Sequence, residues 1–340
     1  MINRLLLSRT DNIGDVILTL PLSIWWKKKY PESKILFLGK EYTRAVIEAC
    51  SAVDEFISAD QVLGEGSYEK KIQLIKNIHA DAIIHVFPGR ILAKLAKDAR
   101  IPLRIGTFNR IFHWFTCNKL IKLSRKNSRY HETELNFKLI EFLLEDDPKI
   151  PSLEELSKTI ILDKICPIRS DLTSLLDPKK INLILHPKSR GSAREWGLEN
   201  FNQLIKNLSP EQFKVFITGT REEGILCKNL LQENPSIHDM TGKLNLAELI
   251  SFISHCDVLV AASTGPLHIA ASTGIHAIGL FAPKHSIHPG RWGALGPKSQ
   301  YLVVDKFCNS GCTKNTKCSC IQEIQPDSVL QILKKIRKKT

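Results

Sequence analysis

The chain has 340 residues, a length typical of two domains of ordinary size. Hydrophobic residues make up 43% of it and charged residues 24%, proportions that exclude a disordered or collagen-like chain. The formal net charge is +13, and the excess lies in two segments. Residues 90–130 hold eleven lysines and arginines against a single acid, Asp98, and residues 331–340 hold five with no acid. Basic patches of this kind indicate an anionic partner: a nucleic acid, a phosphorylated ligand or an anionic membrane face.

The N-terminus does not resemble a targeting segment. The apolar run Leu5–Leu7 is cut off by Arg9 and Asp11, which leaves it too short for the core of a signal peptide. The weakly charged stretch 258–283 contains Pro266 and two histidines, and it fits strand, turn, helix and strand better than a membrane span. We therefore expect a soluble cytoplasmic protein.

The first half of the chain alternates short apolar runs with amphipathic ones, a pattern that predicts a parallel sheet covered by helices on both faces. Strands are predicted at 5–8, 34–39, 55–57, 82–87, 104–106 and 120–123. Helices are predicted at 15–30, 42–50, 68–78 and 131–144. Residues 145–180 then hold four prolines with little periodicity, and we place the domain linker at 165–180.

The second half repeats this alternation. Strands are predicted at 183–185, 214–218, 237–239, 258–261, 276–281 and 301–304. Helices are predicted at 198–208, 222–232, 246–255 with Asn245 as N-cap, 265–272 and 327–339. The predicted fold class is α/β: two doubly wound, Rossmann-like domains at 1–168 and 180–325, followed by an amphipathic helix at 326–340. Because ligands bind outside the carboxyl ends of such strands, we expect the site in a cleft between two facing domains.

The segment from Arg9 to Val16 follows the first predicted strand directly. Gly14 permits a tight strand-to-helix turn, so Asp15 falls at the start of a helix and at the carboxyl edge of the sheet. A general base facing a substrate would occupy this position, and the helix N-terminus would favour its ionised form. A simple helix cap fits the same spacing equally well.

The segment Ser263–His268 follows the strand predicted at 258–261. Thr264 and Gly265 open a helix, which leaves backbone N–H groups available to a phosphate, and Pro266 suits the first turn. His268 could donate to the same anion. The alternative is an ordinary capped helix with a buried histidine.

Two further loops contain residues suited to a nucleotide. The loop 186–196 has three cations, a glycine and two serines, which suits a phosphate cradle but equally a solvated basic loop. The patterns GxxxxGK[ST] and GxGxxG are both absent. Glu222 and Glu223 follow the strand at 214–218, where an acid can accept from ribose hydroxyls, although acids are also common at helix N-termini.

Taken together and in order, these motifs resemble glycosyltransferase family 9, the bacterial ADP-heptose:lipopolysaccharide heptosyltransferases. The resemblance runs along nearly the whole chain. It is carried by RTDNIGDVILTLP (9–21), HETELNF (131–137), HPKSRGSAREWGLENF (186–201), STGPLHIAA (263–271), RWGALGP (291–297) and the cysteine-rich CNSGCTKNTKCSCIQEIQP (308–326).

The resemblance implies a GT-B fold whose N-terminal domain takes the acceptor and whose C-terminal domain takes the nucleotide-sugar. It implies an inverting enzyme with no cofactor and no catalytic metal, with Asp15 as the base and Arg194 as a phosphate-binding cation. The implied donor-binding residues are Lys188, Ser189, Arg194, Glu222, Glu223, Lys243, Leu244, Ser263, Thr264, Gly265, Pro266 and His268. The implied acceptor-binding residues are Asn12, Gly14, Arg104, Arg110 and Arg125.

The implied reaction moves a heptose or related sugar from a nucleotide-diphosphate sugar, ADP-heptose, to the lipopolysaccharide inner core. Heptose-transferring members usually have Asp where this chain has Ser263, so a member transferring another sugar is one alternative. A non-catalytic nucleotide-sugar-binding relative is another. A nucleic-acid-binding protein is prompted only by the charge, and no recognised nucleic-acid motif is present.

The implied partners are the donor, a phosphorylated glycolipid of the Kdo-lipid A type and the cytoplasmic face of the inner membrane. Aromatic residues lie within the basic segment 90–130, which suits such an acceptor but also a solvated basic surface with core aromatics. The tail helix is expected to pack on the protein and expose its lysines, with an in-plane membrane anchor as the alternative. Cys308, Cys312, Cys318 and Cys320 could bind zinc or serve as structural cysteines.

Overall fold

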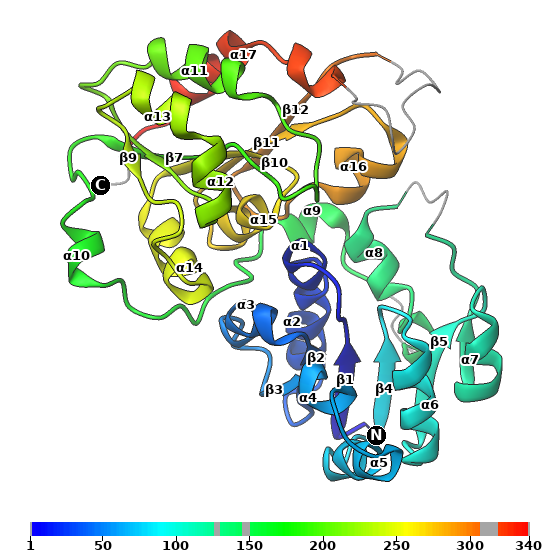
Figure 1. Ribbon diagram of the computed structural model, residues 1–340. Helices are drawn as coiled ribbons and strands as arrows, with labels where there is room; N and C mark the ends of the chain where they lie inside the picture. The colour runs from blue at the N-terminus through cyan, green and yellow to red at the C-terminus, as the bar shows by residue number, and fades with distance from the viewer. Residues whose placement is uncertain (1, 126–129, 145–149, 307–318, 339–340) are drawn as a thin grey trace. The chain divides into compact units, whose positions relative to one another are not determined.

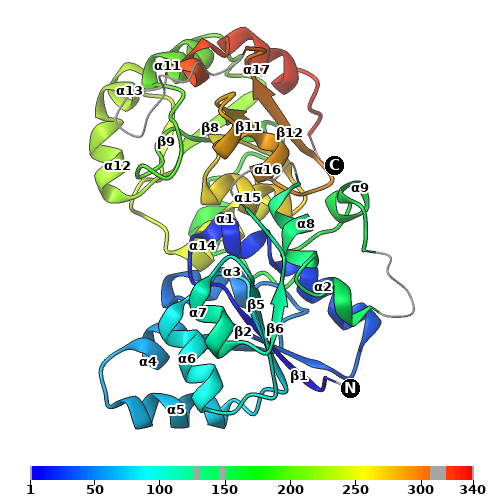
Figure 2. The same ribbon diagram turned by 90° about the vertical axis from the view of Figure 1, so that its right-hand side faces the viewer.

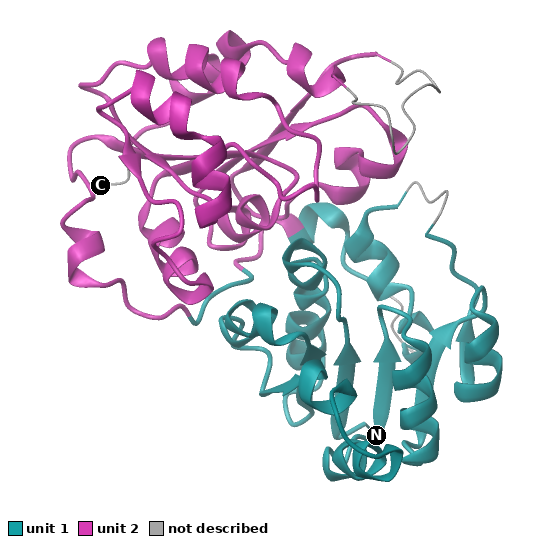
Figure 3. Cartoon of the chain, in the orientation of Figure 1, with its two compact units in different colours: residues 1–156, 161–164 teal, residues 157–160, 165–340 magenta. Residues whose placement is uncertain are grey.

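The computed structural model describes residues 2–125, 130–144, 150–306 and 319–338. The chain divides into two compact units (Figure 3). Unit 1 comprises residues 1–156 and 161–164, and unit 2 comprises residues 157–160 and 165–340. The division therefore falls immediately before the predicted linker at 165–180.

Unit 1 is built on six parallel strands in the order β3-β2-β1-β4-β5-β6, which is the Rossmann order. The strands are β1 (Arg4–Ser8), β2 (Lys34–Gly39), β3 (Glu55–Ser58), β4 (Ala82–His85), β5 (Leu103–Thr107) and β6 (Lys119–Ile121). In the central strand β1, Leu5, Leu6 and Leu7 are fully buried, as expected for a strand covered on both faces. In this register Ser8 pairs with Leu38 of β2 and His85 of β4.

The helices of unit 1 are shorter than predicted. They are α1 (Ile13–Ile17), α2 (Leu20–Lys29), η1 (Glu41–Thr43), α3 (Arg44–Glu48), α4 (Ala59–Leu63), α5 (Tyr68–Asn77), α6 (Arg90–Asp98), α7 (Ile111–Thr116), α8 (Glu132–Phe137), η2 (Glu141–Leu143) and, at the boundary between the units, α9 (Leu153–Ser157).

Several helix predictions for unit 1 were wrong in detail: the helix expected at 131–144 ends at Phe137, and α4 and α7 were not predicted. The single helix expected at 15–30 is broken between α1 and α2, because Pro21 has no N–H to donate to Ile17 and its ring would meet that carbonyl. The helix α6 was missed in a segment interpreted only by its charge. Its inward face consists of Leu92, Ala93, Leu95 and Ala96, all buried.

Unit 2 repeats the same strand order along the chain, β12-β11-β10-β7-β8-β9. The strands are β7 (Ile181–His186), β8 (Phe213–Ile217), β9 (His238–Asp239), β10 (Val258–Ala262), β11 (His276–Phe281) and β12 (Ser299–Val303). The chain order reverses between the neighbouring strands β7 and β10, whose ends meet at His186 and Ala261. The predicted α/β architecture with two doubly wound parallel sheets is confirmed (Figures 1 and 2).

All the helices predicted for unit 2 are present, two of them with different bounds, and four short helices among the described residues were not predicted. The helices of unit 2 are α10 (Ser170–Thr173), α11 (Leu198–Lys206), α12 (Arg221–Leu226), α13 (Lys228–Glu233), α14 (Leu246–His255), α15 (Gly265–Ser272), η3 (His285–Ile287), α16 (Pro289–Trp292), η4 (Cys320–Glu323) and α17 (Pro326–Leu333). The helix expected at 222–232 breaks at Cys227, and the last helix ends at Leu333. Asn245 caps α14, as predicted.

The last helix belongs to the core of unit 2. It packs beside α11 (Figure 1), and Val329 and Leu333 are fully buried among the strands. The Trp196 indole, also buried, donates 2.8 Å to the carbonyl of Ile324 just before α17. Lys338 donates 2.7 Å to the buried Asp257. The tail is therefore fixed by apolar burial, one hydrogen bond and one ion pair.

Polar atoms without partners gather at the carboxyl edge of the unit 1 sheet. His85, fully buried, stacks on His113 with ring centroids 5.5 Å apart. Neither His85 nitrogen, nor Nε2 of His113, nor the hydroxyl of Ser8 has a hydrogen-bond partner among the described residues. Burial lowers the pKa of His85 to about 3, helped by His113 and Arg104. His85 is therefore neutral in the folded protein.

We predict that His85 makes unit 1 sensitive to acid. Below pH 6.5 the unfolded chain binds a proton that the folded chain does not, so stability is complete above about pH 6.5 and falls towards pH 3. The slope from this one group is about 1.4 kcal/mol per pH unit. Hydrogen exchange of the β1 and β4 amides between pH 5 and 7 measures it.

In the variant His85→Leu, the dependence of the unfolding free energy on pH should fall by about 1.4 kcal/mol per pH unit. The variant His285→Leu, at an exposed position, should keep the wild-type dependence. An unchanged slope in His85→Leu would show that the imidazole is protonated in the folded state or has no part in the acid response.

Candidate functional site

The loop after β1 leads directly into the first turn of α1 and places Asp15 at the carboxyl end of the sheet. The side chain of Asp15 is 13% exposed, so it is largely sheltered but still reaches solvent. Asn12 occupies the N-cap position without a side-chain cap bond, and it is exposed. Asp15 is thus not the helix cap that its position in the sequence also allowed. Its role as a base remains a prediction.

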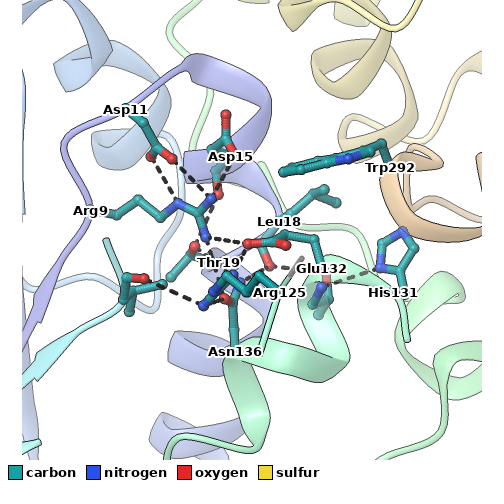
Figure 4. Close-up of polar contacts among 12 residues, drawn as sticks. Arg9, Asp11, Asp15, Leu18, Thr19, Arg125, His131, Glu132, Asn136 and Trp292 are labelled. Carbon is teal, nitrogen blue, oxygen red and sulfur yellow. Dashed lines mark hydrogen bonds and ion pairs between the residues drawn. The ribbon is translucent and has the colours of Figure 1, made fainter. Parts of the chain in front are cut away.

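A buried guanidinium organises this loop. Arg9 is 3% exposed, and its Nε and Nη2 donate 2.8 and 3.0 Å to the two carboxylate oxygens of Asp11. The same Nη2 donates 2.5 Å to Oδ1 of Asp15 (Figure 4). Nη1 donates 3.0 Å to Glu132 and 3.3 Å to Asn136. One side chain therefore ties the loop, the first turn of α1 and α8 together.

The helix α8 contributes the second half of this network. Glu132, only 1% exposed, accepts from Arg9 and also from Arg125. Asn136 accepts 3.0 Å from Arg125 and donates 2.9 Å to the carbonyl of Leu18, at the break between α1 and α2. The carbonyl of Leu18 at the helix break is thus satisfied by α8. We name Arg9, Asp11, Asp15, Glu132 and Asn136 the Arg9 cluster.

The Arg9 cluster fixes one oxygen of Asp15 and leaves the other accessible. Oδ2 of Asp15 accepts no hydrogen bond from any residue that the structure describes. Burial raises the pKa of Asp11, Arg9 opposes this and Asp15 adds to it. The Tyr42 hydroxyl donates 2.5 Å to the Asp11 carbonyl, and burial together with both aspartates raises the pKa of Tyr42. The arrangement suits a carboxylate that accepts a proton through its second oxygen.

The predicted acceptor-binding arginines have different environments. Arg125 is part of the network around α8, and Arg104 donates 2.8 Å to the carbonyl of Thr116, joining β5 to the end of α7. Arg110 is exposed, and its guanidinium has no partner among the described residues. Only Arg110 of the three is presented freely to solvent. The roles of Arg9 and Glu132 were not predicted from the sequence, although both residues lie within the motifs 9–21 and 131–137.

In unit 2, the loop after β7 is shaped by an acid that the sequence prediction did not consider. Glu195 forms an ion pair with Lys188, and its other oxygen accepts 3.0 Å from the amide and 3.1 Å from the hydroxyl of Ser189. At its tip Arg190 and Gly191 have positive φ values of 48° and 78°. Arg194 is half-buried and has no partner among the described residues. Arg190, at the exposed tip, has no partner among these residues either, so what distinguishes Arg194 is that it is a partly buried cation without one.

The second predicted donor segment begins α15, immediately after the neighbouring strand β10. Thr264 occupies the N-cap, 4% exposed, and its hydroxyl has no hydrogen-bond partner in the described part of the chain. Gly265 and Pro266 form the first turn, and His268 is 4% exposed. Ser263 precedes them, half-buried. A buried hydroxyl at a helix N-terminus adds a donor to the free amides there.

The remaining predicted donor residues follow β8 and β9. Glu223 is 5% exposed and closes a capping box, accepting 2.8 Å from the amide of Thr220. Glu222 is exposed, and bonds to its own amide and to Thr220 lower its pKa. The Lys243 ammonium donates 2.6 Å to the carbonyl of Asp239, with Leu244 half-buried beside it in the chain.

The topology brings these loops to one edge of the unit 2 sheet. The loops after β7 and β10 flank the point where the strand order reverses, and the loops after β8 and β9 follow on the β7 side. This is the place where doubly wound sheets bind nucleotides.

Within the described residues, no group of three or more His, Cys, Asp or Glu side chains could hold a metal ion. Cys308, Cys312 and Cys318, the core of the predicted zinc alternative, lie outside the described residues.

Comparison with known proteins identifies the family. Residues 122–322 match Glycosyltransferase family 9 (heptosyltransferase). The chain belongs to this family. It is therefore a glycosyltransferase, and the resemblance found in its sequence is confirmed.

Individual relatives agree with this assignment. A putative glycosyltransferase of Haemophilus influenzae is 25% identical over 316 residues, covering 90% of this chain and 89% of the relative. Lipooligosaccharide heptosyltransferase 2 of Campylobacter jejuni is 25% identical over 170 residues, covering 48% of this glycosyltransferase and 53% of the relative. The structure of ADP-heptose lps heptosyltransferase II of E. coli superposes with a TM-score of 0.74 at 16% identity, covering 97% of each chain. The predicted GT-B fold is confirmed by this likeness.

We predict that Glu132 is essential for the Arg9 cluster to fold. Among the described residues Glu132 is the carboxylate that Arg9 and Arg125 share, so Glu132→Gln weakens a charge-assisted contact to each, although Arg9 keeps Asp11 and Asp15. Loss of charge-assisted hydrogen bonds in a buried position costs about 1.5–3 kcal/mol. Urea unfolding followed by hydrogen exchange of the α8 amides measures the change. Glu141→Gln, an exposed substitution in η2, should change stability by less than about 0.5 kcal/mol, and equal effects would contradict the prediction.

Proposed function

We propose that this glycosyltransferase transfers a heptose from ADP-heptose to the inner core of lipopolysaccharide, with inversion and without a metal. The donor and acceptor are those after which its relatives are named, including a lipooligosaccharide heptosyltransferase and an ADP-heptose lps heptosyltransferase. The observation that carries the proposal is the pairing of two preformed sites on one chain. A largely sheltered carboxylate lies at the edge of the unit 1 sheet, and a helix N-terminus suited to an anion lies at the edge of the unit 2 sheet.

The donor diphosphate is proposed to bind at the start of α15 and along the loop after β7. The supporting features are the unpartnered Thr264 hydroxyl, the amides of the first turn and the unpaired guanidinium of Arg194. The negative charge of Glu195 already balances Lys188, which leaves Arg194 as the cation best suited to the developing charge of the leaving group. Stabilising the negative charge on the leaving diphosphate is usually the largest single electrostatic contribution to such a reaction. These protein donors would take the role that a metal has in other transferases.

The acceptor is proposed to react at Asp15. Its free oxygen Oδ2 takes the proton of an acceptor hydroxyl. The acceptor oxygen then forms a bond to the anomeric carbon of the donor sugar, and the bond from that carbon to the diphosphate breaks, its electron pair leaving with the diphosphate. Arg9 holds Oδ1 at 2.5 Å, so the carboxylate presents a fixed oxygen. The glycolipid acceptor would also require contact with a membrane. None of the helices in the described residues is long and apolar enough to cross one.

The transferred sugar has a second candidate. Ser263 stands where heptose-transferring members usually carry an acid, beside the start of α15. A hydroxyl cannot make the charge-assisted contacts of a carboxylate to sugar hydroxyls. A different sugar on the same type of nucleotide is therefore the alternative to heptose.

We predict that Asp15→Asn lowers kcat about 10²–10⁴-fold, because the amide cannot take the proton of the acceptor hydroxyl. The assay follows sugar transfer from ADP-heptose to a Kdo-lipid A acceptor, with other ADP- and UDP-sugars in parallel. Glu69→Gln, the same chemical change at an exposed position in α5, should leave kcat unchanged. Wild-type transfer by Asp15→Asn would refute the base assignment, and turnover of another sugar alone would refute heptose.

We predict that Arg194→Gln weakens ADP binding about 10–100-fold, because the phosphate loses a charge-assisted hydrogen bond in a half-buried position. Isothermal titration with ADP measures this without an acceptor. Arg190→Gln removes the same charge from the exposed tip of the same loop and should change the Kd less than about threefold. Equal weakening by both variants would indicate general attraction by the loop rather than a contact with Arg194.

A further inference from the structure

The helices α6 and α7 form an amphipathic surface on unit 1 that the chemistry of transfer does not use. The two helices pack against each other, and both views show them side by side (Figures 1 and 2). Their inward faces are buried in unit 1, through Leu92 and Leu95 of α6 and His113 of α7. Their outward faces differ in chemistry: α7 presents apolar side chains and α6 presents cations.

The apolar part is unusually bare for a water-exposed helix. On α7, Ile111 is 69% exposed and Phe115 is 68% exposed, and the four-residue spacing puts them on one face. Ile91, in the first turn of α6, is 61% exposed. Trp114 lies beside them at 48% exposure, and its indole nitrogen donates 2.7 Å to the carbonyl of Phe108. The polar group of the indole is thus satisfied internally, and its hydrocarbon part faces outward.

The cationic part lies directly beside the apolar part. Arg90, Lys94 and Lys97 follow at spacings of four and three, which puts them on one face of α6, and all three are exposed. Together with Asp98, Phe112 and Thr116 they line a groove of about 460 Å³ that also includes Ile111 and Phe115. Asp98, the single acid of residues 90–130, accepts 2.7 Å from Tyr68. The acid is therefore occupied within unit 1, and the cations dominate the charge of this face.

We propose that the α6–α7 surface docks unit 1 on an anionic lipid bilayer. Phe115, Ile111 and Ile91 would enter the boundary between headgroups and acyl chains, while Arg90, Lys94 and Lys97 contact lipid phosphates. Apolar side chains beside three cations and a single acid, Asp98, match the interface of an anionic membrane in both polarity and charge. A nucleic acid would leave the aliphatic side chains without a partner. The inference deepens the proposed function in one respect, since it supplies the surface from which a lipid-anchored acceptor is reached.

The test uses the full chain and sedimentation with vesicles of phosphatidylethanolamine and phosphatidylglycerol, compared with phosphatidylcholine alone. We expect binding to the anionic vesicles only, weakening as salt rises. Ile111→Ser with Phe115→Ser should lower the partition coefficient about tenfold or more. Lys94→Glu with Lys97→Glu should lower it to a similar degree and abolish the salt dependence.

Matched controls exist on unit 2. Ile225→Ser with Leu226→Ser removes two apolar side chains of 70% and 59% exposure, and Lys179→Glu with Lys228→Glu makes the same change in net charge at exposed positions. Both should bind vesicles as the wild type does. Equal losses in the controls, or no vesicle binding by the wild type, would overturn the proposal. So would a wild-type dimer that the α7 variant converts to monomer, because a second copy would then cover the face.

The outcome is separable from the proposed reaction. The α7 variant should retain wild-type kcat/KM with a deacylated, water-soluble acceptor and lose activity only with acceptor embedded in vesicles. If no sugar is transferred to either acceptor by the wild type, the proposed reaction is wrong while the vesicle result still stands. If transfer in vesicles is unaffected by the α7 variant, the docking surface is wrong while the reaction stands.

Discussion

The buried guanidinium of Arg9 is the interaction on which the rest of unit 1 depends. It sits at the exit of the central strand and contacts three carboxylates that come from two distant parts of the chain. A charge at 3% exposure is retained only where its partners satisfy it, and here five hydrogen bonds do so. The arrangement is better understood as a positioning device than as a source of stability. It orients one oxygen of Asp15 inward and leaves the other for chemistry.

Unit 2 uses a similar principle with an opposite charge. Glu195 folds the loop after β7 back on itself by binding Lys188 and the amide and hydroxyl of Ser189. The loop can then adopt positive φ at Arg190 and Gly191 and still present Arg194 unpaired. In both units an internal ion pair shapes a loop at the end of a strand. The group suited to a substrate is the one without a partner in this pairing, Oδ2 of Asp15 in unit 1 and the guanidinium of Arg194 in unit 2.

The charge of the chain is likewise divided between internal and external uses. Arg104 and Arg125 are bound within unit 1, although their place in the basic segment suggested an acceptor surface. Arg90, Lys94 and Lys97 remain outside, beside exposed apolar residues. The basic residues behind the net charge of +13 therefore have two separate roles. Some bind groups within unit 1 near the edge of its sheet, and others form an exposed face suited to an anionic surface.

The sequence by itself determined the alternation of strands and helices, the two-domain class, the family and the loops at which chemistry is expected. Short continuous apolar runs and longer amphipathic runs are local signals, and motifs such as 9–21 and 263–271 are contiguous. Only the tertiary structure decided the pairing of Arg9 with Glu132, 123 residues away, and of Glu195 with its loop. It also decided that α6 is a helix with a cationic outer face, because a charge count does not show which residues are buried. Partners distant in sequence are brought together by the sheet, and no local pattern encodes them.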